Sequence, residues 1–293
     1  MTMRKTKSKS FARMRAAVLL VSLAASLVLT SCLGNIEAET NQQPTDETTI
    51  VETSETAPIV ETTAEPTPTP EPDLADLPPS EDAPVVALTF DDGPSLRDTG
   101  TLLDLLAAEE VPATFFVIGS QVEIGREELV KRAYDEGHEI GNHTYSHQIL
   151  TTLDQAQVRQ ELSDTSDMIE NIIGSKPTVM RPPTGAWSDD IAAASEELGM
   201  AVVNWNWQSC PEDWNHHDDP QHISDFVIET AQNGHIILLH DTNEATVASM
   251  PDMIAGLKER GFRFMTVSQM LEHLGEGHPQ AGGVYHTYAQ PEN

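Results

Sequence analysis

Seven short apolar runs recur along the chain, and amphipathic stretches separate them. Runs of this length are typical of buried strands, while the stretches between them have the apolar spacing of helices. Buried strands that alternate with helices form a parallel sheet that the helices cover. The pattern therefore predicts an α/β fold, a small or incomplete (β/α) barrel with about seven parallel strands. The runs are residues 85–90, 113–118, 138–142, 177–181, 200–205, 235–240 and 262–267.

Composition excludes several classes of protein. The 293 residues include 16 Lys and Arg against 47 Asp and Glu, a formal net charge of −31. A nucleic-acid binder needs a positive surface for the phosphate backbone, so we expect no nucleic-acid partner. The cysteine count is 2, which excludes a disulfide scaffold and a cysteine-rich zinc module.

The first residues have the pattern of an export signal. Six basic residues and no acid occur in residues 1–32, and an apolar run of 14 residues (16–29) ends just before Cys32. Such a run is short for a hydrocarbon core of about 30 Å and is typical of a signal peptide. Leu29-Thr30-Ser31-Cys32 resembles the bacterial lipoprotein box, which implies a lipid anchor on Cys32. The alternative is an ordinary secretory signal with an incidental cysteine.

The amino-acid composition changes after the signal peptide. Residues 33–82 contain 13 acidic residues, no basic residue and no aromatic residue. A segment this polar buries too little apolar surface to offset its chain entropy, so we expect a disordered Glu/Thr/Pro-rich tether. We accordingly divide the chain into a lipoprotein signal peptide (1–31), a lipidated cysteine with its tether (32–82), one folded domain (83–275) and a polar tail (276–293).

Polar side chains follow four of the apolar runs at the point where each run ends. In a β/α barrel the residues that do chemistry come from the carboxyl ends of the strands. Acids, imidazoles and an arginine at four such ends therefore indicate a functional site. The segments are Asp91-Asp92, His143 to His147, Arg181-Pro182-Pro183 and His240-Asp241.

The spacing of His143 and His147 suggests a metal site. If the segment forms one helical turn, both imidazoles lie on one face, as a shared metal ion requires. A third ligand has to come from elsewhere, and Asp91 or Asp92 can supply it. Taken singly, each feature has a simpler explanation, because such histidines are mostly surface or core residues and Asp-Asp-Gly-Pro is more often a turn.

These segments together resemble the polysaccharide deacetylase family, the NodB-homology domain of carbohydrate esterase family 4. The resemblance covers roughly residues 83–275 and implies a metal-dependent deacetylase on a distorted (β/α) barrel. The segments that match its five motifs, in order, are Thr89-Phe90-Asp91-Asp92-Gly93, His143-Thr144-Tyr145-Ser146-His147, Arg181-Pro182-Pro183-Thr184-Gly185, Asp213-Trp214 and Leu238-Leu239-His240.

The resemblance implies a role for each residue around the metal. Asp92, His143 and His147 hold one divalent ion. Zn²⁺ is the leading choice, and Co²⁺, Ni²⁺ and Mn²⁺ are the alternatives. Asp91 is the general base that takes the proton of the attacking water. Arg181 orients Asp91 and keeps it ionised, because a nearby cation favours a charged carboxylate.

It also implies how the acetyl group and the leaving amine are handled. The backbone N–H of Thr184 stabilises the oxyanion, and His240 protonates the departing amine, which is a poor leaving group otherwise. Asp213 pairs with His240. Trp214 and Leu238 form the walls of a small pocket for the acetyl methyl.

Two segments depart from the family pattern. Thr184 stands where the third motif usually has tyrosine, so the backbone contact is kept but contacts of an aromatic ring with sugar are lost. The fourth motif has extra residues between Trp205 and Asp213. The acid that aligns there is therefore open, and an altered substrate preference is expected.

We expect a lipid-anchored, extracytoplasmic monomer that removes N-acetyl groups from the N-acetylhexosamine units of a polysaccharide. Peptidoglycan is favoured because the tether would place the domain over the cell wall. The first alternative is an O-acetyl esterase on xylan-type glycans, which the same site would serve. The second is a lipid-anchored glycan-binding protein without activity, which we disfavour because the base, the acid and the metal ligands are all present.

Overall fold

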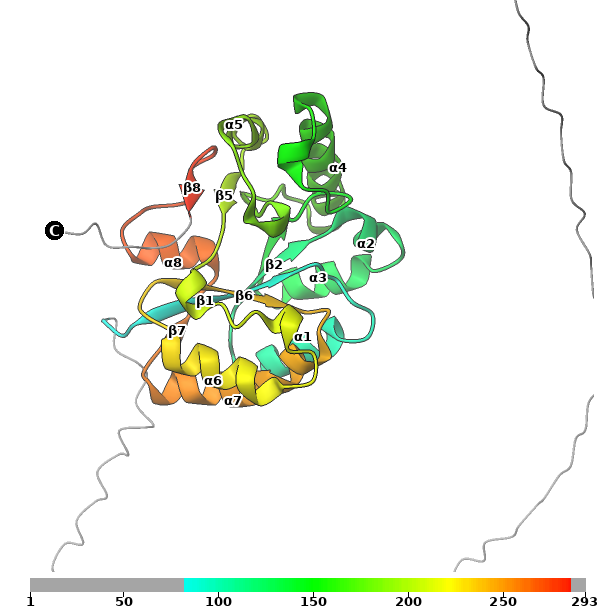
Figure 1. Ribbon diagram of the computed structural model, residues 1–293. Helices are drawn as coiled ribbons and strands as arrows, with labels where there is room; N and C mark the ends of the chain where they lie inside the picture. Colours follow the sequence, from blue (N-terminus) through cyan, green and yellow to red (C-terminus); the bar gives the residue numbers. More distant parts are fainter. Residues whose placement is uncertain (1–81, 286–293) are drawn as a thin grey trace, which may run out of the picture. The chain divides into compact units, whose positions relative to one another are not determined.

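The computed structural model describes residues 82–285, and the structural statements below concern this part of the chain (Figure 1). The expected signal peptide, Cys32 and the tether up to residue 81 lie outside it, as do residues 286–293. Within residues 82–285, the helices are too short or too polar to cross a membrane.

Strands and helices alternate along the described chain, as the apolar pattern predicts. Each of the seven expected apolar runs contains a strand. The strands are β1 (Val85–Asp91), β2 (Thr114–Val117), β3 (Glu139–Asn142), β4 (Val179–Met180), β5 (Ala201–Val203), β6 (His235–His240), β7 (Arg263–Phe264) and β8 (Val284–Tyr285). The α-helices are α1 (Thr99–Ala108), α2 (Gly119–Glu123), α3 (Glu127–Asp135), α4 (Gln155–Ile173), α5 (Asp189–Glu197), α6 (Pro220–Thr230), α7 (Glu244–Glu259) and α8 (Val267–His273).

The strands form one parallel sheet in the order β6-β1-β2-β3-β4-β5-β8, and β7 pairs with the beginning of β1. The sheet curls into a half-barrel that stays open, because β5 pairs with β8 rather than with β6 (Figure 1). Asn206 bridges the opening: its amide donates to the carbonyl of Ile236 at 3.0 Å, and its Oδ1 accepts from the Ile236 amide at 2.9 Å. The prediction of a distorted (β/α) barrel is confirmed.

The strand β8 is not predicted by the sequence analysis, which assigns its residues to a polar tail. It pairs with β5 in parallel, and the Tyr285 carbonyl accepts a hydrogen bond from the Asn204 amide at 2.7 Å. Two residues between polar neighbours are too few to show the alternation by which a strand is recognised.

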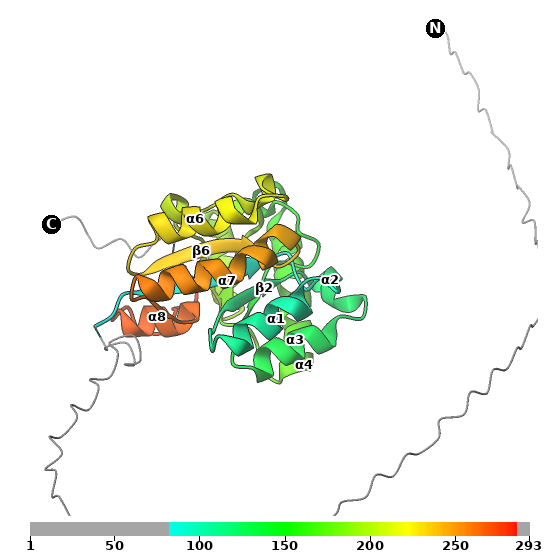
Figure 2. The same cartoon turned by 90° about the horizontal axis from the view of Figure 1, so that it is seen from below.

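Side chains alternate between two cores along β1. Leu88 and Phe90 pack in the core that also contains apolar residues of α1, α6 and α7, the helices on the outer side of the sheet (Figure 2). Ala87 packs in the inner core, which α8 completes. By the same two-residue period Asp91 shares the inner side with Ala87. The first strand thus delivers a carboxylate to the inside of the half-barrel at its carboxyl end.

Candidate active site

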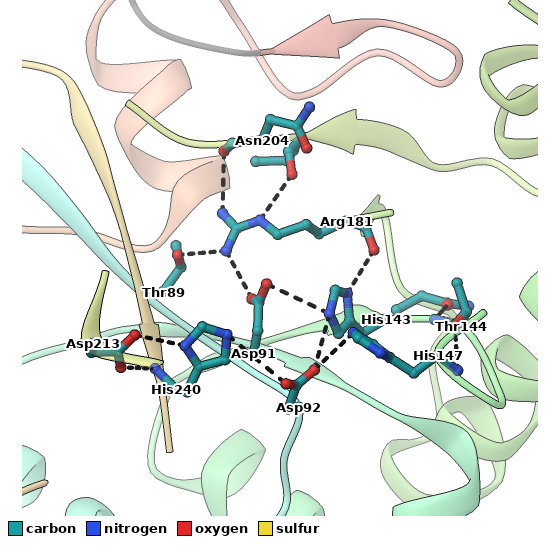
Figure 3. Close-up of polar contacts among 12 residues, drawn as sticks. Thr89, Asp91, Asp92, His143, Thr144, His147, Arg181, Asn204, Asp213 and His240 are labelled. Atoms are coloured by element: carbon teal, nitrogen blue, oxygen red, sulfur yellow. Dashed lines mark hydrogen bonds and ion pairs between the residues drawn. The ribbon is translucent and has the colours of Figure 1, made fainter. Parts of the chain in front are cut away.

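The carboxyl ends of β1, β3, β4 and β6 bring the residues of the expected site together (Figure 3). Asp91 on β1 is the register partner of His240 on β6, so the expected base and acid lie on neighbouring strands. His143 follows β3, and Arg181 follows β4. A hydrogen bond joins the two strand ends, because the Arg181 amide donates to the carbonyl of Asn142, the residue before His143, at 2.9 Å. The parallel sheet therefore explains why residues distant in sequence meet.

Three of these residues form a group with metal-ligand geometry. One ligand atom from each of Asp92, His143 and His147 lies within 4.8 Å of the other two. The Nε2 atoms of His143 and His147 are 3.3 and 3.1 Å from the Oδ1 of Asp92. The structure thereby singles out Asp92, rather than Asp91, as the acid that completes the group.

The expected helical turn between the two histidines is wrong. The segment after β3 is an irregular loop, and Thr144 and His147 have left-handed backbone conformations, with φ of 66° and 58°. Asn142 Oδ1 accepts from the Thr144 amide at 2.8 Å, and Thr144 Oγ1 accepts from the His147 amide at 3.1 Å. These contacts turn the loop back, so the two rings meet with centroids 5.0 Å apart without a helix.

The donor set fits a divalent cation. The buried Oδ1 of Asp92 has no hydrogen-bond donor among the described residues, although two imidazoles lie beside it. His143 Nδ1 lies 2.7 Å from the Arg181 carbonyl and donates to it, which leaves Nε2 with a lone pair for a ligand. Burial opposes ionisation of Asp92, but the neighbouring imidazoles outweigh it and lower the pKa of this carboxyl. A carboxylate oxygen and two Nε2 atoms are ligands that Zn²⁺ accepts.

Arg181 lies beneath the site and is fully buried. Its Nη1 donates to Asp91 Oδ1 and to Thr89 Oγ1, both at 2.8 Å. The Nε and Nη2 atoms donate to the carbonyls of Val203 and Asn204 at 3.0 and 3.2 Å. With one oxygen of Asp91 held in this way, the other, Oδ2, faces His143 Nε2 at 3.6 Å (Figure 3).

His240 is held on the other side of the site by Asp213. Its Nδ1 donates to Asp213 Oδ1 at 2.8 Å, and its backbone amide donates to Asp213 Oδ2 at 2.8 Å. The ring then directs Nε2 toward Asp92, 3.9 Å from Oδ2 (Figure 3). Burial alone would lower the pKa of His240, but the Asp213 carboxylate outweighs it and raises the pKa to about 9. The imidazolium is therefore available as an acid at neutral pH.

The structure also shows which acid of the lengthened fourth motif contacts His240. Asp213 is buried and contacts His240, whereas Glu212 is exposed and has a left-handed φ of 49°. Thr246 Oγ1 and Asn243 Nδ2 donate to Asp213, at 2.6 Å to its Oδ2 and 2.7 Å to its backbone carbonyl. The sequence analysis missed these two supporting residues, because polar residues in the first turns of a helix are common and give no signal of their own.

The remaining expected site residues are Thr184, Trp214 and Leu238. Thr184 is exposed in a short 3-10 turn with a left-handed φ of 62°. The Trp214 ring meets the His240 ring edge to face, with centroids 5.6 Å apart. Leu238 is buried in the inner core, one strand period below His240. Trp214 thus contacts a residue of the site, whereas Leu238 lies in the core on the same strand as His240.

Comparisons with known proteins identify relatives of this chain. The model of the polysaccharide deacetylase family matches residues 79–203. The chain is 39% identical over 188 residues to peptidoglycan-N-acetylmuramic acid deacetylase PdaC of Bacillus subtilis, across 64% of this chain and 39% of PdaC. It is 36% identical over 192 residues to peptidoglycan-N-acetylglucosamine deacetylase of Bacillus cereus, across 64% of this chain and 89% of that protein.

A solved structure gives the same result at the level of the fold. The family 4 acetyl xylan esterase from Clostridium thermocellum, in complex with a cobalt ion, matches with a TM-score of 0.64 and 30% identity, over 70% of this chain and 100% of that one. The chain therefore belongs to the polysaccharide deacetylase family of hydrolases. It spans well under half of the length of PdaC, at 39%.

Proposed function

We propose that this chain is a divalent-metal-dependent N-deacetylase that acts on N-acetylhexosamine units of a polysaccharide, with peptidoglycan as the favoured substrate. The observation that carries the proposal is that Asp91 and His240, register partners on adjacent strands, both lie next to the Asp92–His143–His147 group, at 3.6 Å from His143 and 3.9 Å from Asp92. The names of the Bacillus subtilis and Bacillus cereus relatives support peptidoglycan as the substrate.

The reaction would break the amide C–N bond and form a C–O bond with water. Asp92, His143 and His147 would hold a divalent ion, which would supply Lewis-acid activation of the acetyl carbonyl and of the water. Asp91 Oδ2 accepts the proton of the attacking water, because Oδ1 is occupied by Arg181.

The second half of the reaction needs a proton on nitrogen. The Nε2–H of the His240 imidazolium donates to the leaving nitrogen, and the Asp213 carboxylate stabilises the charged ring until then. The backbone N–H of Thr184 is the proposed donor to the oxyanion. The products are acetate and a free amine on the sugar.

The test is acetate release by the full chain, purified in detergent, from defined glycans. We expect release from N-acetylglucosamine oligomers or peptidoglycan fragments, loss of release after exhaustive chelation, and recovery on addition of Zn²⁺. The His143→Ala variant should lose both the bound ion and the activity. Full activity after chelation would reject the metal-dependent mechanism.

The second candidate is an O-acetyl esterase of xylan-type glycans. The structural match to the Clostridium thermocellum acetyl xylan esterase favours it. Acetylated xylan belongs in the same panel of substrates for this reason. Release of acetate from xylan but not from N-acetyl glycans would establish the esterase, and release from neither would support a glycan-binding protein.

A further inference from the structure

The loop between the two candidate histidine ligands is held by a carboxylate that the mechanism does not use. Glu161, on α4, accepts hydrogen bonds from the backbone amides of Tyr145 and Ser146 at Oε2, at 3.0 and 2.7 Å. Its Oε1 accepts from the Ser146 hydroxyl at 2.6 Å. One side chain therefore satisfies two consecutive backbone donors midway between His143 and His147.

The loop needs such support because its backbone is strained. Thr144 and His147 have positive φ, a conformation that costs a non-glycine residue on the order of 1 kcal/mol or more. The amides of Tyr145 and Ser146 are not part of the hydrogen-bond pattern of the sheet, and both donate to Glu161 on α4. Without Glu161, two N–H groups of the loop would lose their acceptor.

The helix α2 holds the same loop by donating hydrogen bonds to the loop's backbone carbonyls. The amides of Gly119 and Ser120, at the beginning of α2, donate to the carbonyls of Thr144 and Tyr145 at 3.0 and 2.9 Å. The approach is so close that a Cβ on Gly119 would lie 2.8 Å from a ring carbon of Tyr145. The loop is thus fixed between α2 and α4.

The helix that carries Glu161 is itself fixed to the strand that leads into the loop. Asn142, the last residue of β3, donates from Nδ2 to the Leu162 carbonyl at 2.8 Å and to Ser166 Oγ at 2.9 Å. Leu162 follows Glu161 directly, so the position of the carboxylate is set relative to His143 by a buried contact. A carboxylate placed in this way can define the backbone path from His143 to His147.

We propose that Glu161 is a positioning residue that preorganises His143 and His147 for a divalent ion. The proposal rests on the proposed function, because it assigns Glu161 to the metal site of that function. It acts through the loop backbone and contacts neither the ion nor the substrate. Groups that orient metal ligands in this indirect way typically change metal affinity by about 10–100-fold when they are removed.

The test is the affinity of the metal-free full chain, purified in detergent, for Zn²⁺ by calorimetric titration. Glu161→Met keeps about the length of the side chain but removes both acceptor oxygens from the loop amides. We expect its Kd for Zn²⁺ to rise by about 10–100-fold. Glu161→Asp keeps the charge but shortens the side chain, and it should recover part of the loss. Asp167→Asn is the matched control, since Asp167 lies on the same helix and pairs with Lys176 at 3.1 Å.

Two further measurements separate positioning from a general loss of structure. The visible absorption of bound Co²⁺ should change in Glu161→Met and not in Asp167→Asn, because it reports ligand geometry. High Zn²⁺ should restore much of the acetate release of Glu161→Met, since the catalytic groups remain.

An unchanged Kd and Co²⁺ spectrum in Glu161→Met, with only a lower unfolding temperature of the metal-free protein, would overturn the proposal. In that case the proposed function survives, because the wild type still binds the ion. A wild type that binds no divalent ion would instead overturn both.

Discussion

At the scale of single residues, Asp91 and Arg181 form a buried ion pair whose geometry decides which carboxylate oxygen is free. We predict that Asp91→Asn binds Zn²⁺ almost as the wild type does but loses turnover by about 10²–10⁴-fold, because the attacking water has no base. Arg181 keeps three acceptors, Thr89, Val203 and Asn204, so the variant should fold with reduced stability. Zinc titration and single-turnover acetate release measure the two effects. Wild-type turnover in this variant would remove Asp91 from the role of base.

The acid is tested by changing the leaving group. His240→Asn should retain the metal and should reduce turnover of an N-acetyl glycan by about 10²–10⁴-fold. An activated acetate ester should be much less affected, since its leaving group departs without protonation. Equal losses on the two substrates would leave His240 a structural residue.

Asp213 sets the pH range in which His240 serves as an acid. The pKa of His240 is raised to about 9, so the protonated ring persists through neutral pH and is lost as the pH rises through that value. Asp213→Asn removes the stabilising charge and lowers the pKa of His240. The alkaline limb of the kcat/KM profile should therefore move to lower pH, while the acid limb stays in place. A profile that does not move would show that another group governs the alkaline limb.

At the scale of elements, α4 offers a test that separates helix stability from the metal site. Its first turn is closed by a capping box: Asp154 accepts from the Gln157 amide at 2.9 Å, and Gln157 Oε1 accepts from the Asp154 amide at 3.0 Å. Asp154→Ala should cost about 1 kcal/mol and lower the unfolding temperature by about 2–4 °C. Differential scanning calorimetry measures this. Zinc affinity should not change, and a large loss of affinity would show that α4 stability alone controls the ion.

The strands were predicted correctly from the sequence, and the loop between the two histidines was not, each for a physical reason. Buried parallel strands are apolar on both faces, so the seven runs were visible without any structure. The loop from His143 to His147 was misassigned to a helical turn, because a spacing of four residues is equally compatible with a loop that has two left-handed residues. Thr144 has no sequence feature that signals a positive φ. Glu161 was missed for a related reason, since an acid on a polar helix normally faces solvent.

At the scale of the whole molecule, the proposed anchor and the candidate active site belong to separate segments of the chain. We propose that the protein is held at the extracytoplasmic face of the membrane by a lipid on Cys32, which lies outside the described residues. Cys32→Ala should move the protein from the membrane fraction to the soluble fraction or the medium, as measured by fractionation and immunoblotting. Acetate release from soluble oligomers should be unchanged. A variant that stays with the membrane in high salt would contradict the lipoprotein assignment.

The strand order has a consequence for the sequence of events during folding. The three candidate metal ligands lie within residues 92–147, on loops after β1 and β3, whereas His240 reaches the site only when β6 pairs with β1. Glu161 and the Arg181 carbonyl, which hold the ligand loop and the His143 ring, also precede β6, so the ion site can assemble before β6 pairs with β1. Binding of the metal ion and the appearance of activity are then two separate steps during folding. β1 and β6 are about 150 residues apart in the sequence. Activity therefore comes late, because the pairing of distant strands is slow.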